Sequence, residues 1–125
     1  MENIIDVKEC YDGLKDNKMS VREFSGILNT VTDIKEFALG FIGLVKKDIE
    51  DDHKNHESII NALALLCQNT DITEEMRSKI VEALIEIAKK IQDKQFKPRE
   101  IIAILGMLLA SIIAIIWRLT TKKNK

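Results

Sequence analysis

Residues 101–117 read IIAILGMLLASIIAIIW and are the longest uncharged stretch of the chain. A transmembrane helix needs about 20 mostly apolar residues, because each residue supplies ~1.5 Å of the ~30 Å of hydrocarbon. Counted to Leu119, this stretch extends roughly 28 Å, since the stem of Arg118 can run along the lipid tails. Its isoleucines and leucines contribute about −3 to −6 kcal/mol to membrane insertion. The stretch therefore predicts one C-terminal transmembrane helix.

The alternative is a buried helix in a soluble protein. A helix at the edge of a small bundle normally keeps one polar face in water, and its apolar residues form a stripe. In residues 101–117 every face is apolar. Covering such a helix with protein alone would take almost all of the preceding chain. The pattern favours lipid, and a core helix or an oligomer seam of a soluble bundle is the alternative.

Side chains typical of a membrane–water interface flank the apolar stretch. Aromatic residues gather at the head groups, and basic side chains extend toward them. The residues that we expect at the two interfaces are Phe96, Lys97, Arg99, Trp117, Arg118, Lys122 and Lys123. Basic residues thus lie on both sides, so the positive-inside rule is nearly balanced.

Small residues recur inside the apolar stretch at Gly106, Ala110 and Ala114. A spacing of four places them on one helix face, where another helix backbone could approach closely in the bilayer. This face is the candidate surface for self-association into a homo-oligomer.

The rest of the chain predicts helices throughout. Ser20 and Glu23 form a capping-box pattern, and Thr73 precedes another apolar periodicity as an N-cap. Pro98 is expected in the first turn of the last helix, because the residue before proline avoids helical geometry. We therefore expect an all-α fold: a small soluble bundle of about five helices at 1–97, a single C-terminal transmembrane anchor at 98–119 and a basic tail at 120–125.

A second uncharged run, FALGFIGLV at 37–45, is too short to cross a bilayer. Runs of this length are more often central helices of a soluble core. Gly40 and Gly43 would let a neighbouring helix pack closely against it. We expect this run in the centre of the bundle.

The charges indicate a location for the bundle. Residues 1–100 carry 15 basic and 20 acidic side chains, whereas the tail from Arg118 carries four basic and no acidic ones. The bundle lacks the clustered basic residues of nucleic-acid-binding proteins, so no nucleic-acid partner is expected. Its N-terminus has no secretory-signal pattern. We expect a cytosolic bundle on a tail anchor, in a mitochondrial outer membrane or a bacterial inner membrane.

Catalytic and metal-binding patterns are weak. His53 and His56, with acidic neighbours, have the residue types of a metal site, but structural zinc takes four protein ligands and no cysteine or third histidine is close. Cys10 and Cys67 belong to no metal-binding spacing and are expected to be reduced core residues. No phosphate loop or nucleophile motif is present in the sequence. The sequence therefore predicts no enzyme, no catalytic residues, no cofactor and no metal.

Two functions fit these expectations. In the first, the cytosolic bundle is a protein-interaction or regulatory module, and the bilayer and an unidentified protein are its partners. In the second, the chain is a membrane-active effector, holin-like or pore-forming, that oligomerises through its C-terminal helix. The second function lacks polar residues to line an aqueous path, since Ser111 is alone in the apolar stretch.

Overall fold

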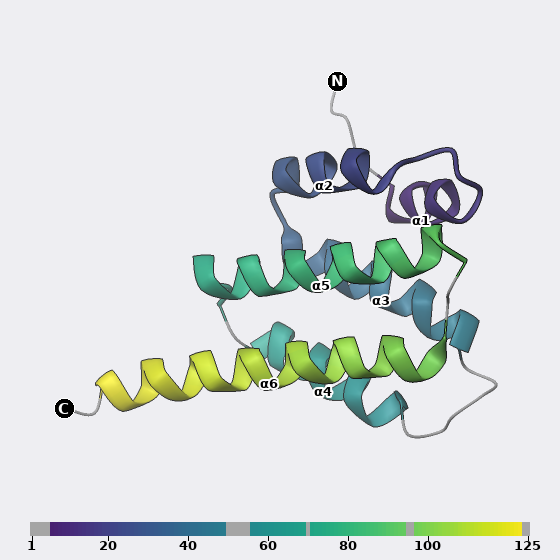
Figure 1. Ribbon diagram of the computed structural model, residues 1–125. Helices are drawn as coiled ribbons and strands as arrows, with labels where there is room; N and C mark the ends of the chain where they lie inside the picture. Colours follow the sequence, from purple (N-terminus) through teal and green to yellow (C-terminus); the bar gives the residue numbers. More distant parts are fainter. Residues whose placement is uncertain (1–5, 50–55, 70, 95–96, 124–125) are drawn as a thin grey trace.

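A computed structural model gives the fold of residues 6–49, 56–69, 71–94 and 97–123, and all the regular structure within these ranges is helical (Figure 1). The six helices are α1 (Val7–Lys15), α2 (Val21–Thr30), α3 (Ile34–Ile49), α4 (His56–Asn69), α5 (Glu74–Gln92) and α6 (Pro98–Lys123). The expected all-α fold, with a long apolar helix after five shorter ones, is confirmed.

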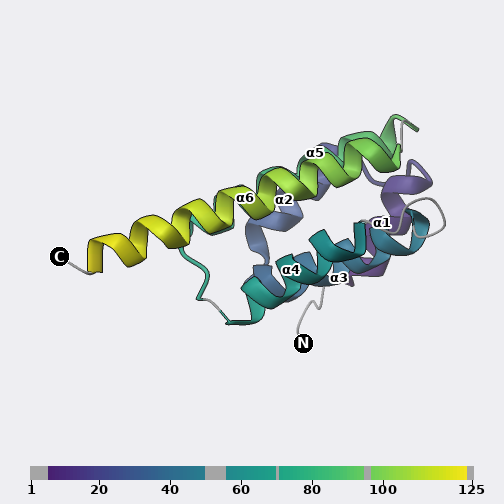
Figure 2. The same cartoon turned by 90° about the horizontal axis from the view of Figure 1, so that it is seen from below.

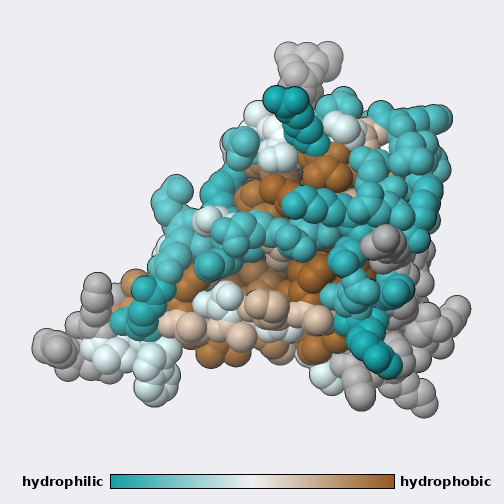
Figure 3. Space-filling model, in the orientation of Figure 1, coloured by the Kyte–Doolittle hydropathy of each residue, from teal (hydrophilic) through white to brown (hydrophobic). Residues whose placement is uncertain are grey.

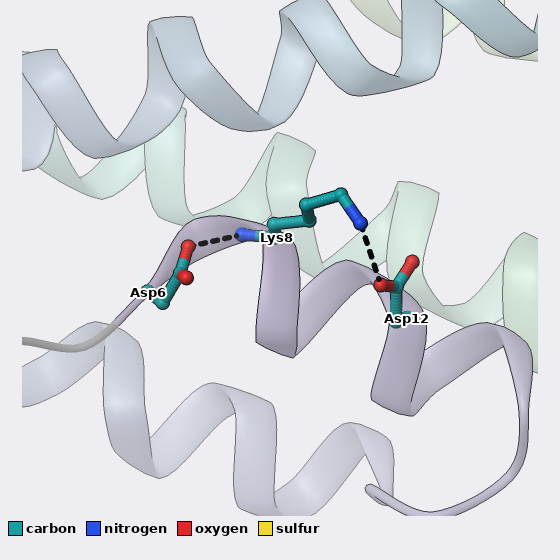
Figure 4. A network of polar contacts seen from close by, with 3 residues as sticks. All are labelled: Asp6, Lys8 and Asp12. Atoms are coloured by element: carbon teal, nitrogen blue, oxygen red, sulfur yellow. Dashed lines mark hydrogen bonds and ion pairs between the residues drawn. The ribbon is translucent and has the colours of Figure 1, made fainter.

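Helix α1 begins at a side-chain cap. A carboxylate oxygen of Asp6 accepts a hydrogen bond from the backbone N–H of Lys8 at 2.9 Å (Figure 4). One turn further on, Lys8 Nζ lies 3.4 Å from Asp12 Oδ2. The cap satisfies one of the N–H groups that a helix start leaves without an intrahelical partner. The ion pair is exposed and contributes little to stability.

The helix starts that the sequence predicted are confirmed. Ser20 Oγ accepts from the backbone N–H of Glu23, and a Glu23 carboxylate oxygen accepts from the backbone N–H of Ser20, both at 3.0 Å. This is the reciprocal capping box. Thr73 Oγ1 accepts from the backbone N–H of Met76 at 3.1 Å at the start of α5. Pro98 is the first residue of α6.

Aromatic residues join the first three helices. The ring of Phe41 in α3 lies 5.7 Å from that of Tyr11 in α1, edge to face, and 5.2 Å from that of Phe24 in α2. Phe24 also faces Phe37 at 6.3 Å. All four side chains are buried. The run at 37–45 is therefore a core segment, as predicted. The close packing expected at its glycines is not found, because a methyl group added at Gly40 would make an ordinary contact with Val7 Cγ2 at 3.5 Å and one added at Gly43 would meet nothing within 4 Å.

Side chains of α5 close the C-terminal ends of α1 and α2. Arg77 donates two hydrogen bonds from Nη2, to the carbonyl of Leu28 at 3.1 Å and to that of Val31 at 2.7 Å. Gln92 Nε2 donates to the carbonyl of Leu14 at 3.0 Å. The last carbonyls of a helix lack intrahelical partners, so these donors complete the ends of both helices. They also hold α5 against the N-terminal half of the bundle.

Replacing Arg77 with methionine should therefore destabilise the fold. The half-buried guanidinium is lost, and hydrogen bonds from charged groups contribute about 1.5–3 kcal/mol. We expect the free energy of unfolding, measured by urea denaturation, to fall by about that amount. Arg22→Met is the matched control, because Arg22 is exposed on α2. Equal stabilities for the two variants would show that the Arg77 contacts are unimportant.

Helix α6 lies alongside α5 and also packs on α4. Figures 1 and 2 show that α6 runs antiparallel to α5 and that its last turns project beyond the other helices. Lys90 near the end of α5 pairs with Glu100 at the start of α6. Glu75 in the first turn of α5 pairs with Arg118 near the end of α6. The two helices are therefore aligned over almost the whole of α5.

A candidate membrane-spanning helix

Among the described residues, one helix is long and apolar enough to cross a membrane. The segment is Arg99–Thr121, which contains the uncharged stretch at 101–117. Its length satisfies the requirement of about 20 residues for a hydrocarbon core of ~30 Å. Core helices of soluble proteins sometimes meet the same condition, so the surroundings of α6 in the fold are important.

One stripe of α6 is buried in the bundle. Its residues alternate at spacings of four and three, which places them on one face of a helix. They are Ile101, Leu105, Leu108, Ile112 and Ile115, each at most 4% exposed. All but Ile115 belong to the continuous core that α1–α5 also form. Helix α6 is therefore a packed part of this fold.

The burial of this stripe is energetically important. Burying a leucine or isoleucine side chain contributes about 1.5–3 kcal/mol, so the five residues together contribute about 8 to 15 kcal/mol as an upper bound. Net stabilities of domains are about 5–15 kcal/mol. Removing α6 would thus remove a contribution as large as the whole net stability. Tests of α6 therefore require point variants of the full chain rather than truncation after Lys97.

The face of α6 opposite this stripe is exposed and apolar, whereas Ile102, Ile104, Leu109 and Ile116 are partly buried against the core. The side chains of Met107 and Trp117 are both 73% exposed, Ile113 is 49% exposed and Leu119 is 44% exposed. In an 18-residue window of the apolar segment, 28% is buried within the fold. Figure 3 shows pale and brown side chains along α6, below the teal band that follows α5. Monomeric soluble proteins seldom leave a continuous apolar face of this length in water.

The small-residue face is mostly uncovered. A methyl group added at Gly106 would lie 4.0 Å from Ile59 Cδ1, so this glycine faces α4. Ala110 and Ala114 are exposed. Within this chain, the predicted packing face therefore meets another helix at Gly106, and its other two residues are accessible. Self-association through it stays a prediction.

The residues predicted for the membrane interfaces lie at both ends of α6. Lys97 and Arg99 are exposed at its start, and Trp117 is exposed near its end. Arg118 is also exposed, but it pairs with Glu75 in this arrangement. Lys122 and Lys123 are the last two residues of α6. Phe96 lies outside the described residues.

A groove runs between α5 and α6. It encloses about 530 Å³, and its α5 wall carries charged side chains whereas its α6 wall is mainly apolar. The charged residues are Lys79, Glu82, Glu86 and Lys89, and the α6 residues are Ile104, Met107, Leu108 and Ser111. Four charged side chains thus flank the middle of the apolar helix.

Beside the groove, Lys90 forms a hydrogen bond with Glu100. This hydrogen bond and the negative charge of Glu100 raise the pKa of Lys90.

Metal binding receives no support within the described ranges. His53 lies outside them, and His56 is the first residue of α4. No group of three or more His, Cys, Asp or Glu side chains with metal-site geometry occurs in the described part of the chain. Cys10 is a buried free thiol, as predicted.

Cys10 should react slowly in the folded protein. Burial raises the pKa of its thiol, and the charges of Glu9 and Asp6 raise it further. Since the thiolate is the nucleophile, we expect alkylation at neutral pH to be at least about a hundredfold slower than in urea. Because the pKa of the Cys10 thiol is higher in the folded protein than in the unfolded chain, its protonated form favours folding. This contribution to the free energy of unfolding is present at neutral pH and decreases as pH rises above the ordinary thiol range.

Alkylation should be followed by mass spectrometry in a Cys67→Ala variant, so that only Cys10 contributes. Equal rates in buffer and in urea would contradict the burial of Cys10.

Sequence reasoning missed the contacts of α6 with α4 and α5. The four–three spacing of Ile101, Leu105 and Leu108 was a possible signal. It was hidden because the opposite face, with Met107 and Ile113, is apolar as well.

Comparisons of the chain with models of protein families, with curated proteins and with solved structures gave no match.

Proposed function

We propose that α6 anchors the chain in a membrane and that the remaining helices act as a protein-interaction or regulatory module. The observation that supports the anchor is the exposed apolar surface of α6, which includes Met107, Ile113 and Trp117. Such a surface is stable in lipid and unfavourable in water. The expected insertion energy of about −3 to −6 kcal/mol and the length of roughly 28 Å are both sufficient for a span.

The proposed orientation leaves the bundle in the cytosol. A folded bundle that carries many charged side chains does not cross a bilayer readily, so we expect it to stay on the side where it is made.

The proposed interaction surface is the face of α4 and α5 on which α6 lies. Its ability to hold α6 indicates the chemistry that it accepts: a helix with an apolar stripe at four–three spacing. The ends of the surface carry Lys90 and Glu75, which pair with an acidic and a basic residue of α6. A partner helix would match it with an acidic residue at its N-terminal end and a basic residue near its C-terminal end.

The anchor is tested by flotation and carbonate extraction of the full-length protein from cell membranes. Protease is then added to the sealed membranes. We expect carbonate-resistant flotation and digestion of the bundle from the cytosolic side. Recovery of the protein in the soluble fraction would contradict the anchor. Protection of the bundle inside sealed membranes would contradict the orientation.

Release of a dye from liposomes separates this proposal from the pore-forming alternative. The purified protein should bind the liposomes without releasing the dye. Concentration-dependent release would favour a membrane-active effector.

The interaction surface is tested with a photo-cross-linking amino acid at Glu86, an exposed position on α5 beside the groove. The same amino acid at Lys8, exposed on α1, is the control. After irradiation of intact membranes, we expect one discrete adduct from position 86 and none from position 8. Its identification by mass spectrometry should reveal a helix with the stated pattern. Identical adducts from both positions would contradict this surface.

A further inference from the structure

Helix α5 accompanies α6 along the entire length that would cross a bilayer. The pair formed by Lys90 and Glu100 lies at one end, and the pair formed by Glu75 and Arg118 lies at the other. Positions 100 and 118 are about 27 Å apart along a helix at ~1.5 Å per residue, close to the thickness of the hydrocarbon core. In this arrangement α6 cannot enter the bilayer without α5.

Helix α5 is unsuited to that environment. Between its two ion pairs it carries the charged groove residues Lys79, Glu82, Glu86 and Lys89, which lie opposite the central α6 residues Met107 and Ser111. If α6 spanned the bilayer in its docked position, the charges of Lys79, Glu82 and Glu86 would lie at hydrocarbon depth, whereas Lys89 would lie near the interface beside Lys90. Charged side chains at that depth are strongly unfavourable.

We propose that docking on the bundle and insertion into a bilayer are mutually exclusive states of α6. In solution the helix buries one stripe against α4 and α5, and this is the arrangement that the structure shows. In the membrane the same stripe faces lipid and the bundle has released the helix. The inference rests on the proposed anchoring function and adds its regulation, because the bundle and the bilayer compete for one helix.

Release would also change the bundle. The α4 and α5 face that α6 covers would become free for the proposed partner helix. Docked α6 is then an internal competitor of that partner, and membrane insertion couples location to binding. A ligand that binds only one of two states shifts their populations toward that state.

The test links the far end of α6 to α5 in the full chain. The variant E75C/R118C, with Cys10 and Cys67 replaced by alanine, is joined by a bis-maleimide that contains a cleavable disulfide. The matched control K90C/E100C carries the same link at the end where α5 and α6 are already connected by the chain. Both proteins are mixed with vesicles of phosphatidylcholine and phosphatidylglycerol and floated.

We expect the E75C/R118C link to lower the ratio of floating to non-floating protein by roughly a hundredfold. This factor corresponds to the cost of placing one α5 charge at the bilayer centre. Cleavage of the linker should restore flotation, and the control should float whether linked or cleaved. Circular dichroism and urea unfolding verify that each linked protein is folded.

Flotation of linked E75C/R118C to the same extent as the cleaved protein would overturn the exclusion while leaving the anchor intact. Failure of the unlinked proteins to float would overturn both the anchor and the exclusion. An equal loss in the linked control would also overturn the inference, since that link leaves the far end of α6 free.

Discussion

Replacing both Met107 and Ile113 with lysine is expected to abolish membrane insertion while leaving the fold intact. Both side chains are exposed on α6, so lysine can replace them in the docked state with its charge in water. Near the middle of a transmembrane helix each lysine costs about 2.5–3.5 kcal/mol, and the two together cost about 5–7 kcal/mol. This cost matches or exceeds the expected gain of about 3–6 kcal/mol from the apolar residues, so the double variant should be recovered in the soluble fraction in the carbonate-extraction assay.

A matched double variant tests whether position decides the effect. Asn61 and Leu65 are exposed on α4, outside the apolar segment. Asn61→Lys together with Leu65→Lys adds the same charge without placing it in a bilayer, and this protein should still float. Flotation of the Met107/Ile113 variant would mean that α6 does not span. Loss of flotation in both variants would indicate binding through overall charge.

Replacing Leu105 with alanine is expected to destabilise the docked fold without preventing membrane insertion. Leu105 is fully buried where α6 packs on the bundle. Truncation of a buried leucine to alanine typically costs 2–5 kcal/mol, through lost burial and the remaining cavity. The free energy of unfolding in urea should fall by that amount. Insertion should increase, because the competing docked state is weakened by more than the about 0.3–0.6 kcal/mol that one leucine contributes to insertion.

Met107→Ala is the control for this prediction. It truncates a side chain of similar size on the same helix, but at a position that is exposed in the docked state. Its unfolding free energy should stay within about 0.5 kcal/mol of the parent protein. If the two alanine variants were equally stable, α6 would not be docked in solution, and competition between bundle and bilayer would have no basis.

Local signals made most of the fold predictable. Ser20, Glu23 and Thr73 form caps with neighbours three residues away, and Pro98 restricts the residue before it. Each signal depends on a few adjacent residues, so the sequence contains it directly. The core position of the run at 37–45 followed from its length and from the absence of charge.

Contacts between distant segments were not predictable in the same way. The hydrogen bonds of Arg77 to Leu28 and Val31 join residues 46 to 49 positions apart. In the sequence, Arg77 is one charged residue among many on α5. The docked face of α6 was ambiguous for another reason. Its buried and exposed stripes are both apolar, so periodicity alone cannot distinguish the side that contacts protein from the side that faces outward.

The donors at the end of α5 would also determine how the bundle stands on a membrane. Gln92 holds the end of α1 through the carbonyl of Leu14, and Lys94 donates to the carbonyl of Lys15 at 2.6 Å. The chain between Gln92 and Pro98 can extend about 20 Å at most. With α6 inserted, the ends of α1 and α5 would stay close to the lipid head groups. The bundle could change its orientation on the membrane but could not move away from the surface.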